Sequence, residues 1–378
     1  MIFLLKRFFL FIFIYFLLII KIHAIDTRAD SAVILDSNSN IILFEKNSDV
    51  KQGPASMSKL MLTYIVFERL QNNTLSLDQE FLVSKKAWKY GGSKMFVNVG
   101  DMVSVNDLLK GIIIQSGNDA CIVLAEGLSG SEENMVEEMN DKSIEIGLTG
   151  SNFTNVTGWP HQDHYMTLRD IAHLSKLIID KFPEYYYLFS VNEFTYNDIK
   201  QFNRNSLISI DGYDGLKTGR TTQSGFGIAA SSKRNNRRII SVVNGLNTDK
   251  ERINETKKLV NWAFREFITL DLYKAGDTIQ SAKVWLGKEP FVPLVLNEDL
   301  VITIKKKNID KYKIKLVYET PVISPIKKGD KIAKLHLIEG DNTKTKDIYA
   351  GKNIEKISRF YRSFSIVNYL LFGVSNKN

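Results

Sequence analysis

The chain has 378 residues, of which 44% are hydrophobic and 24% charged, and its net charge is +8. It is long enough for a sizeable core and more than one domain, and its low proline and glycine content excludes a collagen-like or disordered chain. The positive charge is not gathered in an arginine-rich arm, so nucleic acid is not an expected partner. A single cysteine, Cys121, excludes an intrachain disulfide and a cysteine zinc site.

The first 24 residues predict an export signal. A basic start precedes an apolar run at residues 8–20, and Ala24 is a small residue suited to signal peptidase. The alternative is an uncleaved anchor, but a spanning helix needs about 20 apolar residues, and Lys21 interrupts this run. We therefore expect residues 1–24 to be removed on export.

Residues 25–268 predict an α/β domain. Short apolar runs bounded by turn residues predict strands at 32–35, 41–44, 225–231 and 238–243. Apolar periodicity and the capping pairs Ser104–Asp107 and Thr167–Asp170 predict helices over 56–70, from 104, from 167 to before Pro183, and over 250–267. Strands at both ends with helices between them predict a sheet that pairs the first strands with the last.

Residues 269–350 predict a small all-β domain. Its short strand-like runs are at 284–286, 294–296, 300–304, 314–318 and 332–337. Lysines alternate through residues 305–315, and we expect them to form a solvated face rather than a binding patch.

Residues 351–378 predict an amphipathic helix. Its apolar residues recur at spacings of three and four: Ile357, Phe360, Phe364, Val367 and Leu371. Basic residues at its start, with its aromatic content, favour a helix that lies on an anionic membrane surface. The alternative is a helix docked on the β-rich domain.

Three short motifs carry the chemistry: Ser56-Met57-Ser58-Lys59, Ser116-Gly117-Asn118 and Lys217-Thr218-Gly219. On a helix, Ser56 and Lys59 share one face. A serine hydroxyl needs a base to become a nucleophile, and a lysine can be that base if burial or a nearby cation disfavours its charged form. The second motif follows an apolar helix end, and the third is placed at a strand start. Each motif alone is most simply a turn or a chance pattern.

The order of the three motifs after a signal segment is the signature shared by penicillin-binding proteins and class A β-lactamases. With the segments 115–120 and 211–219, the β-rich domain and the tail, the mature chain resembles low-molecular-mass penicillin-binding proteins that are D-alanyl-D-alanine carboxypeptidases. The resemblance implies a β-lactamase/transpeptidase-like serine acyltransferase domain, an exported enzyme peripheral to the periplasmic side of the bacterial inner membrane, and no cofactor or metal. It implies a peptidoglycan stem peptide ending in D-Ala-D-Ala as substrate and β-lactams as covalent inhibitors.

The resemblance also implies roles for individual residues. Ser56 would attack the carbonyl between the terminal D-alanines, Lys59 would take its proton, and Ser116 would relay protons to the departing D-alanine. The remaining site residues would bind substrate: Asn118, Lys217, Thr218, Gly219, Arg220 and Arg204. The backbone N–H groups of Ser56 and Arg220 would hold the oxyanion.

Two departures and several alternatives accompany this interpretation. Arg220 stands where members of the family often carry histidine or an aromatic residue, which leaves substrate preference open. The glycine of Ser116-Gly117-Asn118 favours the carboxypeptidases over class A β-lactamases. The competing functions are a β-lactamase, for which no deacylating glutamate is evident, and a non-catalytic penicillin- or wall-binding protein.

Several other residues have a simple structural explanation as an alternative to a functional one. Arg204 could be a surface arginine, and Trp159 could border a cleft or fill a core. Cys121 is expected to be an inert buried thiol. His161, Asp163 and His164 could be metal ligands, but the sequence shows no further cluster of ligands to complete a site.

Overall fold

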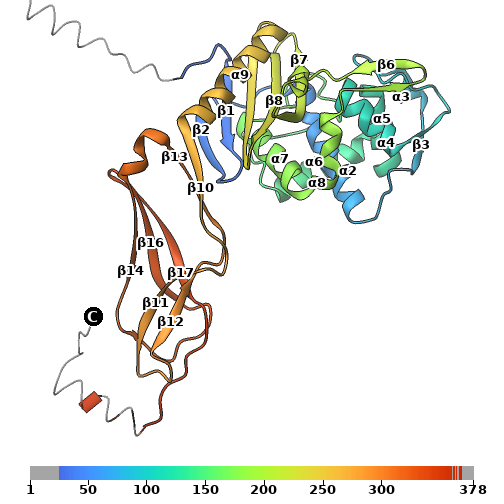
Figure 1. Ribbon diagram of the computed structural model, residues 1–378. Helices are drawn as coiled ribbons and strands as arrows, with labels where there is room; N and C mark the ends of the chain where they lie inside the picture. Colours follow the sequence, from blue (N-terminus) through green and yellow to red (C-terminus); the bar gives the residue numbers. More distant parts are fainter. Residues whose placement is uncertain (1–24, 360, 362, 364–365, 368–378) are drawn as a thin grey trace, which may run out of the picture. The chain divides into compact units, whose positions relative to one another are not determined.

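The computed structural model describes residues 25–359, 361, 363, 366 and 367 (Figure 1). These residues fall into two compact units. One takes in Ile42–Ala263 with the described residues up to Leu35, and the other takes in Asp36–Ile41 with the described residues from Phe264 onward. The expected signal segment, 1–24, lies outside the described residues, as does most of the expected tail helix.

The first unit is built on a five-stranded sheet with the order β2-β1-β9-β8-β7. Its strands are β1 (Ser31–Asp36), β2 (Ile41–Lys46), β7 (Tyr213–Thr221), β8 (Gly225–Arg234) and β9 (Arg237–Leu246). The first strands therefore pair with the last, which confirms the pairing expected from the sequence. β7 lies at the edge of this sheet, so one side of its backbone is not covered by a neighbouring strand.

Helices lie on both faces of this sheet, with α9 on one and α7 on the other (Figure 1). The longer ones are α2 (Lys59–Gln71), α5 (Asn118–Ser129), α6 (Glu132–Glu145), α7 (Leu168–Lys181) and α9 (Asp249–Glu266). The shorter ones are η1 (Ala55–Ser58), α3 (Lys85–Lys89), α4 (Val105–Lys110), η2 (Gly111–Gln115), α8 (Pro183–Tyr186), η3 (Tyr187–Ser190) and η4 (Ser206–Ser209). Both predicted caps are present, since Ser104 accepts from the Asp107 N–H and Thr167 accepts from the Asp170 N–H.

The helix α2 is buried on nearly every side, as its continuous apolar sequence predicts. Its apolar side chains belong to the main hydrophobic core of the first unit, together with residues of α5 and α7. A helix enclosed in this way holds its first residue, Lys59, in a fixed and dry position. The core thus fixes the lysine beside the predicted nucleophile.

The sequence predicted Lys217-Thr218-Gly219 at the start of a strand, and this prediction is wrong. The motif lies inside β7, which begins at Tyr213. Gly215 and Gly219 interrupt the β-branched and aromatic pattern that marks a strand, and pairing with β8 supplies the strand instead, with Lys217 opposite Ala229. Two small antiparallel strand pairs in this unit were not expected from the sequence: β3 (Glu80–Leu82) with β4 (Met102–Ser104), and β5 (Glu193–Tyr196) with β6 (Ile199–Phe202).

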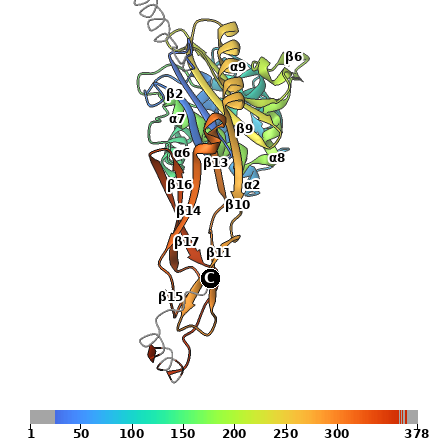
Figure 2. The same cartoon turned by 60° about the vertical axis from the view of Figure 1, so that its left-hand side comes forward.

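Among the residues described, the second unit is all β apart from the short helix η5 (Lys306–Lys311) and a few helical residues after Ser358: Arg359, Tyr361, Ser363, Ile366 and Val367. One two-stranded sheet pairs β10 (Phe267–Tyr273) with β13 (Leu300–Lys305). A six-stranded sheet contains β11 (Thr278–Trp285), β12 (Phe291–Val295), β14 (Tyr312–Tyr318), β15 (Val322–Ile323), β16 (Lys331–Glu339) and β17 (Asn342–Ala350). Figure 2 shows β14, β16 and β17 running side by side.

The five strands expected in this unit are present, and the lysines of residues 305–315 are exposed. Three strands were missed: β10, the two-residue β15 and β17. The sequence of β17 is mostly polar and exposed, so its strand depends on pairing with β16 rather than on an apolar pattern. The first residue of β10 continues the pattern of α9, and its pairing with β13 decides the conformation.

Residues just after Ala350 belong to the packing of the second unit. Ile354 is buried in its core and forms a bridge with Ile326, and Lys356 forms a bridge with Gly287. The tail proper therefore starts beyond Lys356. Among the described residues, no helix is both long and apolar enough to span a bilayer.

A buried carboxylate, that of Asp119, fixes the start of α5 against the segment 95–97. Its oxygens accept from the N–H groups of Met95 at 2.8 Å and Phe96 at 2.9 Å. An amide in its place puts an NH₂ group against these donors. We expect Asp119→Asn to lower the free energy of unfolding by about 1–3 kcal/mol, measured by urea titration.

The matched control is Asp180→Asn, which alters an exposed carboxylate paired with Lys176 on α7. This exposed pair should contribute less than about 1 kcal/mol. Equal stability losses in the two variants would contradict the structural role given to Asp119.

Candidate active site

The predicted nucleophile and base meet at the junction of η1 and α2. Ser56 is half-buried in η1, and Lys59, the first residue of α2, has no exposed surface. The Lys59 Nζ lies 2.9 Å from the Ser56 Oγ. The helical spacing expected from the sequence therefore does bring the amine to the hydroxyl.

Lys59 has two further neighbours, and both are carbonyl oxygens. Its Nζ donates to the side-chain Oδ1 of Asn118 at 2.8 Å and to the backbone oxygen of Thr157. Asn118 is held in this orientation because its Nδ2 donates to the backbone oxygen of Gly91 at 2.8 Å. A carbonyl oxygen can only accept, so of the three neighbours only the Ser56 hydroxyl can donate a proton to Lys59.

Burial weakens the charged form of the two site lysines. It lowers the pKa of Lys59 to about 8, and the nearby charge of Arg204 acts in the same direction. Burial also lowers the pKa of Lys217 well below its ordinary value, and the charges of Lys59 and Arg204 add to this effect. About a tenth of Lys59 is therefore neutral at pH 7, far more than for an ordinary lysine, and this form can accept a proton.

The second motif lies at a sharp change of direction between η2 and α5. The apolar residues of η2 are buried, and the helix ends at Ser116, whose φ of 67° is left-handed. This residue is buried, and its Oγ has no hydrogen-bond partner among the described residues. An unpaired buried hydroxyl is available to a bound group or a transferred proton.

The third motif brings β7 against η1. A Cβ at Gly219 would lie 2.8 Å from the Pro54 backbone oxygen, so only glycine permits this approach of β7 to the segment before Ser56. Lys217 and Thr218 are buried, while Arg220 is exposed and stacks on the Phe226 ring at 4.6 Å. The open edge of β7 can pair with an extended peptide.

The loop 155–160 completes the site and was not predicted to do so. The Asn155 Oδ1 accepts from the N–H groups of Thr157, Gly158 and Trp159 at 3.1, 2.8 and 2.9 Å, which fixes the loop. Gly158 has a φ of 80°, and a Cβ there would lie 2.0 Å from the Ala55 backbone oxygen. The only sequence signal was the turn composition of Thr157-Gly158-Trp159-Pro160, which does not reveal that the Thr157 carbonyl accepts from Lys59.

Three residues with a simpler alternative role in the sequence analysis can now be placed. The Arg204 Nε donates to the Gln115 side chain at 3.4 Å, next to the second motif. Trp159 is 49% exposed and packs edge to face on Tyr90, so it borders the cleft rather than filling a core. Cys121 is fully buried, and burial raises the pKa of its thiol to about 12.

The possible metal site is the last open point. His164 is buried and its Nδ1 accepts from the Thr154 N–H, while His161 is exposed. In the part of the chain that the structure describes, no group of three or more His, Cys, Asp or Glu side chains is arranged to hold a metal ion.

The arrangement contains the components of covalent acyl transfer. It has a hydroxyl with an amine of lowered pKa at hydrogen-bond distance, an unpaired serine hydroxyl, and a second buried lysine on an open strand. A nucleophile paired with an oriented base is the general requirement for forming an acyl-enzyme.

Comparison with known proteins assigns the chain to a family. Residues 20–248 match the D-alanyl-D-alanine carboxypeptidase family, and residues 267–356 match the C-terminal domain of penicillin-binding protein 5. D-alanyl-D-alanine carboxypeptidase DacC of Escherichia coli (strain K12) is 36% identical over 354 residues, which are 91% of this chain and 88% of the relative.

Solved structures agree with this match. Penicillin-binding protein 5 from Haemophilus influenzae is 34% identical with a TM-score of 0.83, over 89% of this chain and all of that structure. Penicillin-binding protein D2 from Listeria monocytogenes, in an ampicillin-bound form, is 28% identical with a TM-score of 0.59, over 64% of this chain and 99% of that structure. The chain therefore belongs to the D-alanyl-D-alanine carboxypeptidase family of penicillin-binding proteins.

Proposed function

We propose that this protein is a serine-type D-alanyl-D-alanine carboxypeptidase that removes the terminal D-alanine from peptidoglycan pentapeptides in cell wall biogenesis. The observation that carries the proposal is the buried Lys59 amine, with a pKa of about 8, at 2.9 Å from the Ser56 hydroxyl. Membership of the family supplies the substrate class.

Acylation begins with the neutral form of Lys59. Its two N–H groups donate to Asn118 Oδ1 and the Thr157 carbonyl, which leaves the lone pair for the proton of Ser56. Ser56 Oγ then attacks the carbonyl between the two D-alanines. The backbone N–H groups of Ser56 and Arg220 stabilise the oxyanion, and a preorganised pair of donors of this kind typically contributes several kcal/mol.

The departing D-alanine needs a proton, and Ser116 supplies it by relay from Lys59. Its buried Oγ, free of other partners among the described residues, suits this role. Asn118 hydrogen-bonds the substrate amide. The substrate's terminal carboxylate is held by Lys217, the Thr218 hydroxyl and Arg204, and Gly219 lets the peptide and η1 lie close to β7.

Deacylation by water separates this enzyme from a β-lactamase. No carboxylate is hydrogen-bonded to Ser56, Lys59 or Ser116 in the described part of the chain, and the buried Asp119 faces the backbone of residues 95–97. A β-lactam acyl-enzyme, which retains its bulky leaving group, should therefore hydrolyse slowly. β-lactams are proposed as covalent inhibitors, in keeping with the ampicillin-bound relative.

The domain organisation is part of the proposal. We assign 1–24 to a cleaved signal peptide, 25–268 to the catalytic domain, 269–350 to the β-rich domain and 351–378 to a membrane-anchoring helix, whose amphipathic part follows Lys356. The mature protein would then be peripheral on the periplasmic side of the inner membrane. The support is the sequence pattern at each end and the two family matches.

The first test of this function uses substrate and inhibitor together. The mature protein should release D-alanine from a pentapeptide ending in D-Ala-D-Ala, and benzylpenicillin should add its mass to Ser56, as read by peptide mapping. The adduct should persist far longer than one peptide turnover. Ser56→Ala should abolish both reactions.

The matched control is Ser58→Ala, because the Ser58 hydroxyl donates to the Ala55 carbonyl rather than to Lys59. This variant should still be labelled. Rapid multiple turnover of penicillin without D-alanine release would favour the β-lactamase alternative, and an adduct without either hydrolysis would favour a non-catalytic penicillin-binding protein.

The second test is the pH dependence of acylation. Lys59 gains its lone pair as pH rises through its pKa of about 8, so the acylation rate should rise between pH 6 and 9 and then level off. At pH 7 the rate should be about a tenth of the plateau. Stopped-flow acylation by a chromogenic cephalosporin measures it.

Lys59→Arg should eliminate this acylation at every pH, since an arginine keeps its proton. A pH-independent rate, or wild-type rates in the arginine variant, would remove Lys59 from the role of base.

The third test concerns the tail. A large apolar side chain contributes about 1.5–3 kcal/mol when fully buried, so the stripe beginning at Ile357 should bind anionic vesicles. In sedimentation with such vesicles, a chain ending at Ser358, which keeps the buried Ile354, should stay in the supernatant. The double variant Phe360→Asp, Phe364→Asp should behave in the same way.

The control is Ile314→Asp with Val317→Asp, two exposed apolar residues of β14. It should sediment as the wild type does. Equal sedimentation of the full-length and shortened chains would support the docked-helix alternative instead.

A further inference from the structure

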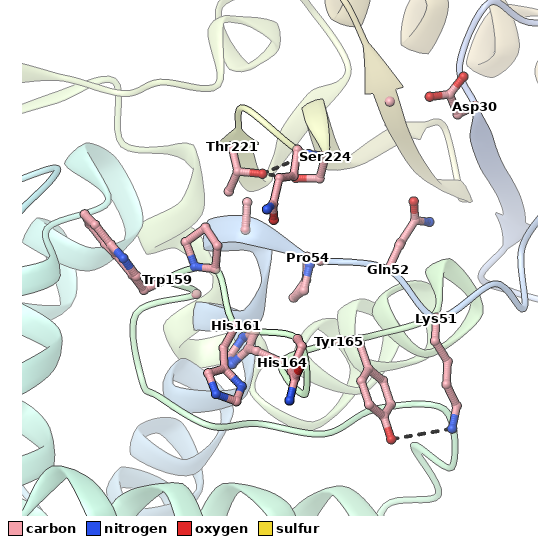
Figure 3. A pocket seen from close by; sticks show the side chains of 17 residues that line it. Asp30, Lys51, Gln52, Pro54, Trp159, His161, His164, Tyr165, Thr221 and Ser224 are labelled. Atoms are coloured by element: carbon pink, nitrogen blue, oxygen red, sulfur yellow. Dashed lines mark hydrogen bonds between the residues drawn. The ribbon is translucent and has the colours of Figure 1, made fainter.

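The loop 155–160 carries the Thr157 carbonyl, one of the two oxygens that accept from Lys59, but only part of this loop is packed. Residues 158–162 line a pocket of about 390 Å³ beside Pro54, and Trp159 lies at its edge (Figure 3). Thr157 itself is buried, whereas residues 159–162 are exposed. Because solvent borders the loop on that side, core packing alone does not fix the direction of the Thr157 carbonyl.

The direction of this carbonyl is set by the peptide unit that joins Thr157 to Gly158. The bond is trans, so its C=O and N–H groups point in opposite directions. The Gly158 N–H donates to the Asn155 Oδ1 at 2.8 Å, and on the other side the Thr157 oxygen accepts from the Lys59 Nζ. The Asn155 side chain therefore holds the peptide plane that carries the acceptor.

Asn155 holds this plane with more than one bond. Its Oδ1 also accepts from the N–H groups of Thr157 at 3.1 Å and Trp159 at 2.9 Å, and from the Thr157 hydroxyl at 3.0 Å. Its Nδ2 donates to the Trp159 carbonyl at 3.0 Å. Asparagine side chains commonly fix turns by bonding to the backbone that follows them. Here the fixed turn delivers an acceptor to the base.

The number of acceptors around Lys59 decides where its lone pair points. The neutral amine has two N–H groups, and the carbonyl oxygens of Asn118 and Thr157 accept both. If the Thr157 carbonyl turned away, one N–H group would donate instead to the Ser56 Oγ, which lies 2.9 Å from the Nζ. The lone pair would then face away from the hydroxyl proton, and Lys59 could not take that proton.

We propose that Asn155 is a positioning residue for acylation, which orients the Thr157 carbonyl so that the lone pair of Lys59 faces the Ser56 hydroxyl. The inference rests on the proposed function, in which Lys59 is the base. Asn155 acts through the loop rather than through the substrate. It therefore controls the rate of the acylation step and not the binding that precedes this step.

The test separates binding from acylation with a chromogenic cephalosporin. Stopped-flow traces of the mature protein, at several cephalosporin concentrations and across the pH range of the acylation profile, give the dissociation constant of the first complex and the acylation rate constant. In Asn155→Ala the carbonyl loses its orientation, so the plateau rate constant should fall about ten- to a hundred-fold, as for a misplaced catalytic group. The dissociation constant should stay within about two-fold of the wild-type value.

The matched control is Asn140→Ala, which removes an asparagine that fixes the nearby residue Phe153. The Asn140 Oδ1 accepts from the Phe153 N–H, and its Nδ2 donates to the Phe153 carbonyl, both at 2.8 Å. Both alanine variants should lower the Tm. Only Asn155→Ala should lower the acylation rate constant, because the bonds of Asn140 to Phe153 do not orient the peptide plane at Thr157.

Asn155→Asp keeps the accepting oxygen and adds a negative charge. The carboxylate can accept from the same N–H groups, so the plateau rate constant should stay within about three-fold of wild type. A nearby negative charge favours the ammonium form, so the pH midpoint of acylation should rise by about half a unit or more. The other titratable or charged groups that interact with Lys59 are unchanged in this variant: Arg204, Asp119, Cys121, Lys217 and His164.

The possible failures are distinct. A wild-type rate constant in Asn155→Ala, or an equal fall in Asn140→Ala, overturns the role given to Asn155 and leaves the carboxypeptidase intact. So does an Asn155→Asp variant with an unchanged midpoint or a plateau as low as that of Asn155→Ala, and the midpoint decides if the alanine variant does not fold. If the wild-type protein is not acylated at Ser56, the proposed function fails and this inference fails with it.

Discussion

The site depends on one buried amine with three neighbours. Two of the neighbours of Lys59 are carbonyl oxygens, and the third is the Ser56 hydroxyl. An ammonium group in this position would lose its hydration, which is the reason its pKa falls to about 8. Once the amine is neutral, its two N–H groups donate hydrogen bonds to the two carbonyl oxygens. Its lone pair can then accept a proton only from the Ser56 hydroxyl. Burial therefore lowers the pKa of Lys59 enough for it to act as a base, and its neighbours direct its lone pair toward the Ser56 hydroxyl.

The rest of the first unit maintains that arrangement. The core around α2 keeps water from Lys59, and Asp119 and Asn155 fix the two segments that carry its acceptors. Burial lowers the pKa of the second lysine, Lys217, and the charges of Lys59 and Arg204 act in the same direction. These groups come from segments far apart in the chain, so the chemistry depends on the complete fold of this unit.

Much of this could be predicted from the sequence, because the informative features are local. The Ser56–Lys59 pair is set by helical spacing, and the caps at Ser104 and Thr167 by adjacent residues. The order of the three motifs indicated the family, which the comparisons confirm. The α/β unit followed by an all-β unit was also expected correctly.

Features that depend on tertiary pairing could not be predicted. β7 contains two glycines and β17 is mostly polar, so both become strands only through their neighbours in the sheet. The backbone carbonyl of Thr157 carries no side-chain signature, although it is a direct partner of Lys59. The pocket beside Ser56 likewise brings together Lys51 and His164, which are distant in sequence.

The most direct measurement of the central claim is the pKa of Lys59 in the resting protein. Lysine labelled with ¹⁵N at Nζ, observed by NMR across pH 6–12, would report it, and the signal is assigned by its loss in Lys59→Arg. The account predicts a midpoint near 8. A midpoint near the ordinary lysine value of about 10.4 would show that almost no neutral Lys59 exists at physiological pH and would contradict its role as the base.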